Sequence, residues 1–252
     1  MSQQARRSKV SRGVVCLAVL THVSIGERST EGLTVTTKPE NLTRKLKKPD
    51  WWLLAPSQQQ GINLTDGTLV QPAQGRDEKG VPFAILMISR DHGATWRVGT
   101  PAFSGGNECQ AVQLGDGSIM LNMRNDHERA MYVTSDLGKT WRPDETNRNT
   151  LIKPNCNGSL RRVDIKQGSE TKRILFFANP QSQESRTHQT IQVSFDDGRT
   201  WPKKYHLLLD ESKGRGYPSI SRVYDKHIGI VYEGSQSDVV FETISLDELL
   251  DR

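Results

Sequence analysis

The sequence predicts an all-β protein of the β-propeller type. A turn motif of the form Ser/Thr-x-Asp-x-Gly-x-Thr-Trp occurs three times, at residues 89–96, 134–141 and 194–201. The motif aspartates lie 45 and 60 residues apart. This spacing suits four-stranded blades of roughly 40 to 50 residues with loop insertions better than it suits a sandwich. No segment before the last ten residues has helical periodicity, so we expect strands throughout.

The first 30 residues differ from the rest of the chain. Four arginine and lysine residues between positions 6 and 12 precede an apolar run over residues 13–20, an order typical of a secretory signal. The alternative interpretation is a strand, because no small-x-small cleavage site follows. A signal would make the protein extracytoplasmic or secreted. We therefore divide the chain into an N-terminal segment, residues 1–30, and a partial propeller, residues 31–252.

The predicted strands are short apolar stretches bounded by turn residues. Asp66-Gly67 and Asp116-Gly117 each lie between alternating apolar residues. This is the strongest short hairpin signal, because both turn positions need positive φ. Further strands are expected over residues 82–89, 173–178, 190–195 and 228–233.

The three aspartates of the repeated motif, Asp91, Asp136 and Asp196, are predicted to be structural. Within the motif, the aspartate accepts backbone N–H bonds, the glycine supplies a left-handed residue, and the tryptophan packs under the hairpin. These tasks are local to each turn. We therefore expect the acids that react to lie elsewhere.

Three such motifs at this spacing resemble the Asp-boxes, or BNR repeats, of sialidases. A glutamate in Asn-Glu-Cys-Gln precedes an arginine by sixteen residues, and a second arginine stands eight residues before the third box. A Gly-Tyr-Pro-Ser segment and a Val-Tyr-Glu-Gly segment follow that box. The resemblance runs from about residue 42 to the C terminus. The family's order of glutamate, arginine, arginine, tyrosine and glutamate is matched by Glu108, Arg124, Arg186, Tyr217 and Glu233.

The resemblance implies a substrate whose chemistry suits these residue types. Sialic acid has a carboxylate on its anomeric carbon, and arginine offers permanent charge and bidentate donors to neutralise it. Arg124 and Arg186 match the second and third arginines of the family's three-arginine cluster. The alternative for each is a surface arginine paired with a nearby acid. Sialylated glycans or glycoconjugates are the implied partners.

The same substrate explains a tyrosine nucleophile. An attacking carboxylate would meet the substrate's own carboxylate, whereas a neutral phenol would not, and sialidases are the recognised exception to two-carboxylate glycosidase chemistry. A phenol with a pKa near about 10 needs a base to take its proton. By resemblance, Tyr217 attacks with retention of configuration and Glu108 shuttles the phenolic proton. The alternative for Tyr217 is a strand tyrosine packed in the core, and the alternative for Glu108 is a surface or turn carboxylate.

Some parts of the family's site have no counterpart in these 252 residues. Glu233 matches the glutamate that orients the first arginine, but the Arg-Ile-Pro motif of that arginine does not occur. The general acid/base aspartate has no match either, and Asp50 is a weak substitute. Sialidases close six blades, whereas the matching residues account for four or five. Two explanations are open. The chain is either a sialidase truncated at its N terminus or given the wrong start codon, or a degenerate relative with a partial pocket. Both predict weak or absent turnover.

The sequence thus predicts an exo-α-sialidase by family, and two other function classes stay open. The first is a non-catalytic sialoglycan-binding or vestigial propeller, and the second is another enzyme that uses the fold. No cofactor or metal is expected, because the histidines and three cysteines form no ligand cluster. The net charge is +5, but the sequence has neither a helical DNA-binding motif nor basic residues interspersed with aromatic ones. It therefore does not predict nucleic-acid binding. The sequence contains no run of about 18 apolar residues, so it predicts no membrane-spanning helix.

Overall fold

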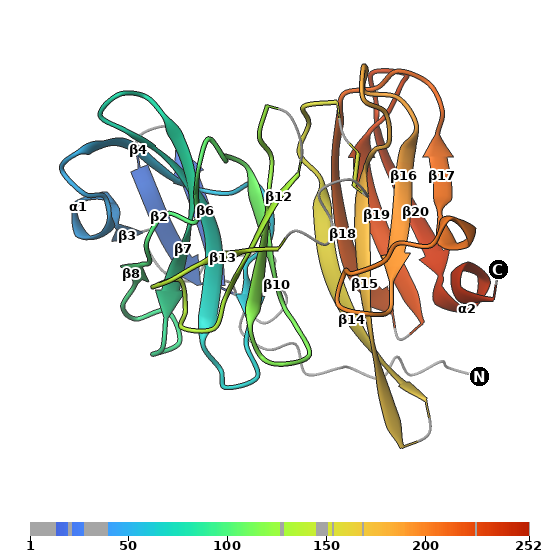
Figure 1. Cartoon of the computed structure of the whole chain (residues 1–252), viewed down its shortest axis with the longest axis horizontal. Coiled ribbons are helices and arrows are strands. Elements are labelled where there is room, and N and C mark those ends of the chain that lie inside the picture. Colours follow the sequence, from blue (N-terminus) through green and yellow to red (C-terminus); the bar gives the residue numbers. More distant parts are fainter. Residues whose placement is uncertain are drawn as a thin grey trace, which may run out of the picture.

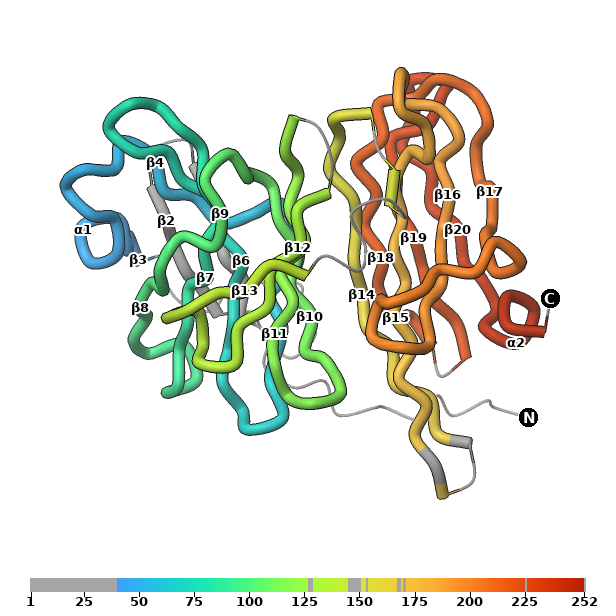
Figure 2. Tube along the Cα trace, viewed as in Figure 1, coloured from blue at the N-terminus to red at the C-terminus, as the bar shows by residue number. Residues whose placement is uncertain are grey.

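The computed structural model describes residues 14–19, 22–27, 40–126, 129–144, 151–152, 154–167, 169–224 and 226–251. These residues are mostly strands, so the predicted all-β fold is confirmed. Five sheets form, and the last four are consecutive blades of a propeller arrangement. Figure 2 shows the chain passing from one sheet to the next across the molecule, from the first blade at the left to the last at the right.

The first sheet contains part of the predicted N-terminal segment. It consists of β1 (Val14–Val19), β2 (His22–Glu27) and β3 (Glu40–Asn41), all antiparallel. A short helix, α1 (Thr43–Leu46), follows. The basic residues 6–12, which suggested a signal, lie outside the described residues.

The first blade is the sheet β4-β6-β7-β8. Two short strands, β5 and β9, pair with its middle strands. The central strand β7 is almost wholly apolar and buried, as expected for a strand covered on both faces. The bounds are β4 (Trp51–Pro56), β5 (Ile62–Asn63), β6 (Leu69–Asp77), β7 (Pro82–Ser89), β8 (Arg97–Val98) and β9 (Phe103–Ser104).

The second and third blades each have four antiparallel strands in sequential order. The second contains β10 (Cys109–Gln113), β11 (Ile119–Met123), β12 (Ala130–Thr134) and β13 (Arg142–Pro143). The third contains β14 (Ser159–Gln167), β15 (Glu170–Pro180), β16 (Gln189–Ser194) and β17 (Leu207–Asp210), with the 3-10 helix η2 (Lys203–Tyr205) before β17.

The fourth blade has three described strands and is followed by a short helix. The strands are β18 (Gly216–Tyr224), β19 (His227–Glu233) and β20 (Val239–Ser245), and the helix is α2 (Leu246–Leu250). β18 is the strand of this blade that contacts β14 and β15 of the third blade (Figure 1).

The hydrophobic core lies between neighbouring blades. One buried cluster joins side chains of β7 to β10 and β11, a second joins the second blade to the third, and a third joins the third blade to the fourth. The first strands of successive blades touch, β10 against β14 and β14 against β18. Loops at the same ends of these inner strands are therefore brought together, although they are far apart in sequence.

The three Asp-boxes form the predicted local turns. In the second box, Asp136 Oδ1 accepts the Thr140 backbone N–H at 3.0 Å and Oδ2 accepts the Thr140 hydroxyl at 2.7 Å. The other two boxes repeat both bonds. The left-handed backbone extends over two residues in each box, because the residue before the glycine also has positive φ. Both oxygens of each Asp-box carboxylate therefore accept hydrogen bonds within their own turn.

Candidate active site

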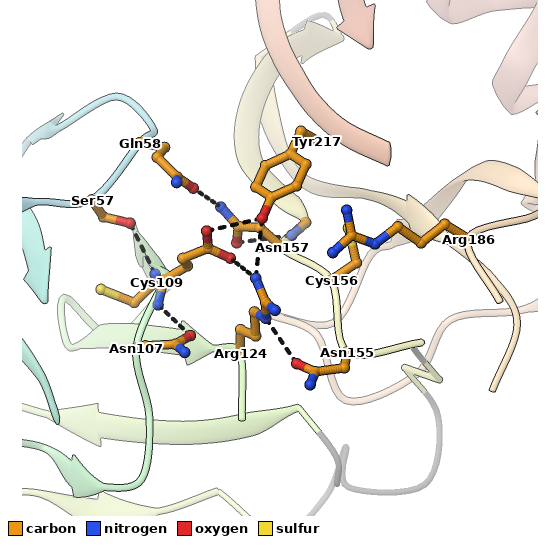
Figure 3. Close-up of polar contacts among 12 residues, drawn as sticks. Ser57, Gln58, Asn107, Cys109, Arg124, Asn155, Cys156, Asn157, Arg186 and Tyr217 are labelled. Atoms are coloured by element: carbon orange, nitrogen blue, oxygen red, sulfur yellow. Dashed lines mark hydrogen bonds and ion pairs between the residues drawn. The ribbon is translucent and has the colours of Figure 1, made fainter. Parts of the chain in front are cut away.

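Glu108, Arg124 and Tyr217 converge into one hydrogen-bonded group (Figure 3). Arg124 Nη1 donates to Glu108 Oε2 at 2.6 Å and to the Tyr217 phenol oxygen at 3.1 Å. The Tyr217 hydroxyl donates to Glu108 Oε1 at 3.2 Å. A phenol, a carboxylate that accepts its proton and a cation beside both are therefore within direct reach of one another.

The hairpin register explains the sixteen-residue spacing of Glu108 and Arg124. The Asp116-Gly117 turn pairs Cys109 with Met123 across β10 and β11. One step beyond this pair, the Arg124 backbone N–H donates to the Glu108 carbonyl at 2.8 Å. The two side chains thus leave the open end of one hairpin opposite each other. The turn chemistry alone fixes this part of the site.

Further polar contacts hold Glu108 and Arg124 in place. Asn155 Oδ1 accepts from Arg124 Nε at 2.8 Å, which leaves Nη1 directed at Glu108 and Tyr217. Asn107 Oδ1 accepts the Glu108 backbone N–H at 2.6 Å. Burial disfavours the charge of Arg124, but the Glu108 carboxylate and Tyr217 outweigh it and raise the pKa of the guanidinium. Arg124 thus remains a full positive charge at the bottom of the site.

Tyr217 enters the site through an unusual backbone. Gly216 and Tyr217 have φ of +89° and +49°, so two successive residues are left-handed. A Cβ at position 216 would lie 2.8 Å from Cys156 Sγ, which restricts this position to glycine on a second ground. The ladder between β18 and β19 shifts register between Gly216 and Ser219. The kink directs the phenol toward the hairpin that carries Glu108.

The surroundings of Tyr217 keep its phenol protonated at neutral pH. Burial, followed by the negative charge of Glu108, raises the pKa of Tyr217 above its ordinary value, and Arg124 offsets only part of this. A neutral phenol bonded to a carboxylate is the resting state that a base-activated nucleophile requires.

Arg186 lies over the ring of Tyr217. Its guanidinium carbon is 5.3 Å from the centre of the Tyr217 ring, a cation–π distance. Arg186 Nη1 donates to the carbonyl of Arg215 at 2.8 Å. In Figure 3 the side chain reaches toward Tyr217 from a different part of the chain than Arg124. Two arginines from separate blades thus flank the phenol.

The structure does not join the other predicted acids to this group. Glu233 pairs with Gly216 across β19 and β18, but its side chain is exposed. Asp50 is exposed just before β4, whereas the active-site end of that strand leads to Gln58. A six-residue strand spans roughly 20 Å, so Asp50 is remote from Tyr217. The Asp-box aspartates are engaged in their own turns.

Several residues around the site were not predicted. Arg129 is fully buried, donates through Nε to Asn122 at 2.6 Å and through Nη1 to the Cys156 carbonyl at 3.1 Å, and stacks near Phe177. Burial lowers the pKa of Arg129 to about 10. It anchors the loop that presents Asn155. An isolated arginine gives no sequence signal for such a role.

The described residues contain no cluster of three or more His, Cys, Asp or Glu side chains that could hold a metal. They also contain no helix long and apolar enough to cross a membrane. A groove of about 780 Å³ lies between α2 and the β14–β15 hairpin. None of the five candidate functional residues lines it, so it is separate from the site.

Comparison with known proteins places these features in a family. A model of the BNR repeat-like domain matches residues 15–231. A sialidase of Bacteroides fragilis is 36% identical over 225 residues, 88% of this chain and 41% of that protein. A sialidase of Micromonospora viridifaciens is 32% identical over 194 residues, 73% of this chain and 29% of that protein.

Solved structures agree with these relatives. A Hadza microbial sialidase superimposes with a TM-score of 0.84 at 35% identity, covering 90% of this chain and 44% of that one. A Trypanosoma rangeli sialidase, solved as a covalent intermediate with 2,3-difluorosialic acid, has a TM-score of 0.73 at 22% identity and shares the fold. The chain spans less than half the length of each of these four relatives.

Proposed function

Because the chain belongs to the BNR-repeat family and is a homologue of sialidases, we propose that its site acts on terminal sialic acid by retaining exo-α-sialidase chemistry. Tyr217 is the nucleophile, Glu108 is its base, and Arg124 and Arg186 bind the substrate carboxylate. The observation that carries this proposal is the direct contact of Tyr217 with both Glu108 and Arg124.

The first step follows from these contacts. The Tyr217 oxygen forms a bond to the anomeric carbon while its proton passes to Glu108 Oε1, 3.2 Å away. The bond from the anomeric carbon to the glycosidic oxygen breaks, and the leaving group departs with the electron pair. Arg124 Nη1, 3.1 Å from the phenol oxygen, stabilises the negative charge that develops there. In the second step, water forms a bond to the anomeric carbon while the bond from that carbon to the Tyr217 oxygen breaks. The phenol oxygen recovers its proton from Glu108, and the proton that the water loses passes through solvent to the released leaving group.

The positions of the two arginines suit the substrate's charge. Arg124 Nη1 lies 3.1 Å from the Tyr217 oxygen, and the Arg186 guanidinium lies over the Tyr217 ring, 5.3 Å from its centre. A carboxylate attached to the anomeric carbon would therefore lie within their combined field when that carbon meets the phenol oxygen. Charge-assisted hydrogen bonds of this kind are about twice as strong as neutral ones.

We further propose that the chain acts weakly on alkyl ketosides and well on substrates with good leaving groups. The sequence lacks an Arg-Ile-Pro segment, and no second carboxylate among the described residues contacts the Tyr217 group. Loss of a general acid costs roughly 10²- to 10⁴-fold for a leaving group that needs protonation. Fluoride and activated phenols leave without such help.

The experiment uses 2,3-difluorosialic acid, which loses fluoride when the phenol attacks. We expect the mass of the intact chain to rise by one fluorosialyl group, and peptide mapping to locate it on Tyr217. Tyr217→Phe should abolish the labelling while the melting temperature stays within a few degrees. Labelling of the Tyr217→Phe variant at the wild-type rate would refute the nucleophile assignment.

A non-catalytic sialoglycan-binding protein is the second candidate, and the pair Arg124 and Arg186 favours it because both residues bind charge without reacting. Calorimetry with free sialic acid separates the two functions. Binding that Arg124→Ala and Arg186→Ala each weaken, together with no covalent labelling of the wild-type chain, would support binding alone.

A further inference from the structure

The backbone around Tyr217, the proposed nucleophile, departs from the regular ladder of its own sheet. Gly216 pairs with Glu233 and Ser219 pairs with Val231, so Tyr217 and Pro218 lie opposite a single residue, Tyr232. Two residues opposite one form a β-bulge. Tyr217 is also left-handed at φ +49°, a conformation that is unfavourable for a non-glycine residue. Such a conformation persists only where neighbouring groups enforce it.

A side chain from the first blade supplies that constraint. Gln59 Nε2 donates to the carbonyl of Pro218 at 2.7 Å, across 159 positions of sequence. Pro218 has no backbone N–H, so it cannot add a donor to the sheet ladder, and its carbonyl is the polar group that this residue offers. The Gln59 bond therefore grips the bulge at the residue directly after the nucleophile.

Gln59 is itself held on two sides. Its backbone carbonyl accepts from Nε2 of the buried Gln71 at 3.3 Å. Ser159 Oγ lies 3.4 Å from Gln59 Oε1 and accepts the Ile220 backbone N–H at 2.9 Å. Because a carbonyl can only accept, the contact with Pro218 also fixes which end of the Gln59 amide carries the nitrogen. Gln59 thus holds β18 within the bulge, at Pro218, and Ser159 holds it two residues later, at Ile220.

The neighbouring residue occupies a different place. Figure 3 shows Gln58 joined to Asn157, from which its Oε1 accepts at 3.2 Å. Gln60 is exposed and follows Gln59 directly. Of the three consecutive glutamines, Gln59 alone contacts the backbone of β18 among the described hydrogen bonds.

We propose that Gln59 is a positioning residue for the nucleophile: its bond to the Pro218 carbonyl stabilises the bulge that aims the Tyr217 phenol at Glu108. Side chains alternate between the faces of a strand, so a one-residue slip in register turns a side chain to the opposite face. Without the clamp, β18 can relax into a regular ladder with β19, and the phenol leaves Glu108. The catalytic consequence rests on the proposed function, whereas the structural consequence does not.

The test compares Gln59→Ala and Gln59→Glu with Gln60→Ala as the matched control. Gln59→Glu keeps the size of the side chain but replaces the donor by an acceptor, so it breaks the same bond without leaving a cavity. We expect both Gln59 variants to react with 2,3-difluorosialic acid roughly 10²-fold more slowly, the size of loss that a misplacement of about 1 Å causes. Affinity for the sialidase inhibitor DANA should change by less than threefold, because Arg124 and Arg186 stay in place.

A second measurement does not depend on turnover. In protein labelled with ¹³C-tyrosine, the Tyr217 resonance is the one that Tyr217→Phe removes. Burial and Glu108 raise the pKa of Tyr217 in the intact site. Release of the phenol should therefore lower its pKa toward the ordinary tyrosine value in Gln59→Ala, which adds no charge. The pKa should be unchanged in Gln60→Ala.

The outcomes separate the two proposals. A Tyr217 titration that is the same in wild type and Gln59→Ala overturns the positioning role, whatever the turnover. An equal change in Gln60→Ala also overturns it, because the effect would not belong to the clamp. A wild-type chain that shows the Gln59-dependent titration but no covalent labelling supports the positioning role and contradicts the proposed function.

Discussion

Replacement of Glu108 by glutamine tests the proton transfer most directly. Glu108 is 7% exposed, and its two oxygens accept separately from Tyr217 and Arg124. A glutamine of the same shape can accept from only one of them, and its amide nitrogen cannot take a proton from the phenol. The variant therefore keeps the packing of the site and loses the proposed base.

The magnitude follows from that loss. A positioned general base contributes about 10²- to 10⁴-fold, so kcat/KM for an activated aryl ketoside should fall by that factor, or about 3–5 kcal/mol in activation free energy. Arg124 loses its ion pair but keeps the bond to Asn155, so affinity for DANA should fall little or rise. The base thus affects the reaction step and not ligand binding.

The assay is the rate of aryl release together with the rate of covalent labelling by 2,3-difluorosialic acid. Glu78→Gln, an exposed glutamate in the β6–β7 turn, is the control and should match the wild type. A folded Glu108→Gln variant that labels at more than a third of the wild-type rate would refute Glu108 as the base. The melting temperature shows whether each variant is folded.

Four further predictions concern binding and stability. Arg124→Lys should weaken DANA binding at least about tenfold by calorimetry, because lysine cannot replace a guanidinium that contacts three partners at once; unchanged affinity would contradict its role. Gly216→Ala should lower the free energy of unfolding in urea by about 1–3 kcal/mol more than Gly117→Ala, since both have positive φ but only position 216 lacks room for a Cβ. Arg129→Ala should cost about 3 kcal/mol or more in the same assay, because it leaves a cavity and two unpaired buried carbonyls; a loss below 1 kcal/mol would show that Arg129 is not an anchor. Hydrogen bonds from Thr95 and then Ser89 lower the pKa of Asp91 from 3.8 to about 2. The contribution of Asp91 to stability is therefore present above pH 4 and is lost as the pH falls toward 2. Melting temperatures of wild type and Asp91→Asn across this pH range would test this prediction.

The parts of the site that depend on local rules were predictable. The Asp-boxes specify their turns through residues within eight positions of one another, and Asp116-Gly117 fixes a hairpin register that sets Glu108 opposite Arg124. Turn residues determine φ directly, so these features need no knowledge of distant contacts. The family resemblance then indicated Tyr217 and Arg186, and the structure places Tyr217 next to that hairpin and Arg186 next to Tyr217.

Other features had no local signal. Gln59 is the middle one of three consecutive glutamines, and its bond to Pro218 exists only because the fold brings the loop after β4 against β18. Arg129 looks like a surface arginine in the sequence and is fully buried in the structure. The groups that hold a side chain in place come from other blades, and a linear pattern cannot show them.

The repeat, the all-β fold and the residue types of the proposed site follow from the sequence, because turn chemistry and strand alternation act over a few residues. Which side chains meet depends on the tertiary structure. It joined the phenol on β18 to a hairpin 93 residues earlier, left Glu233 exposed, and supplied Gln59 as a clamp on the bulge. The physical reason is that packing between blades sets distances between residues that no local pattern relates.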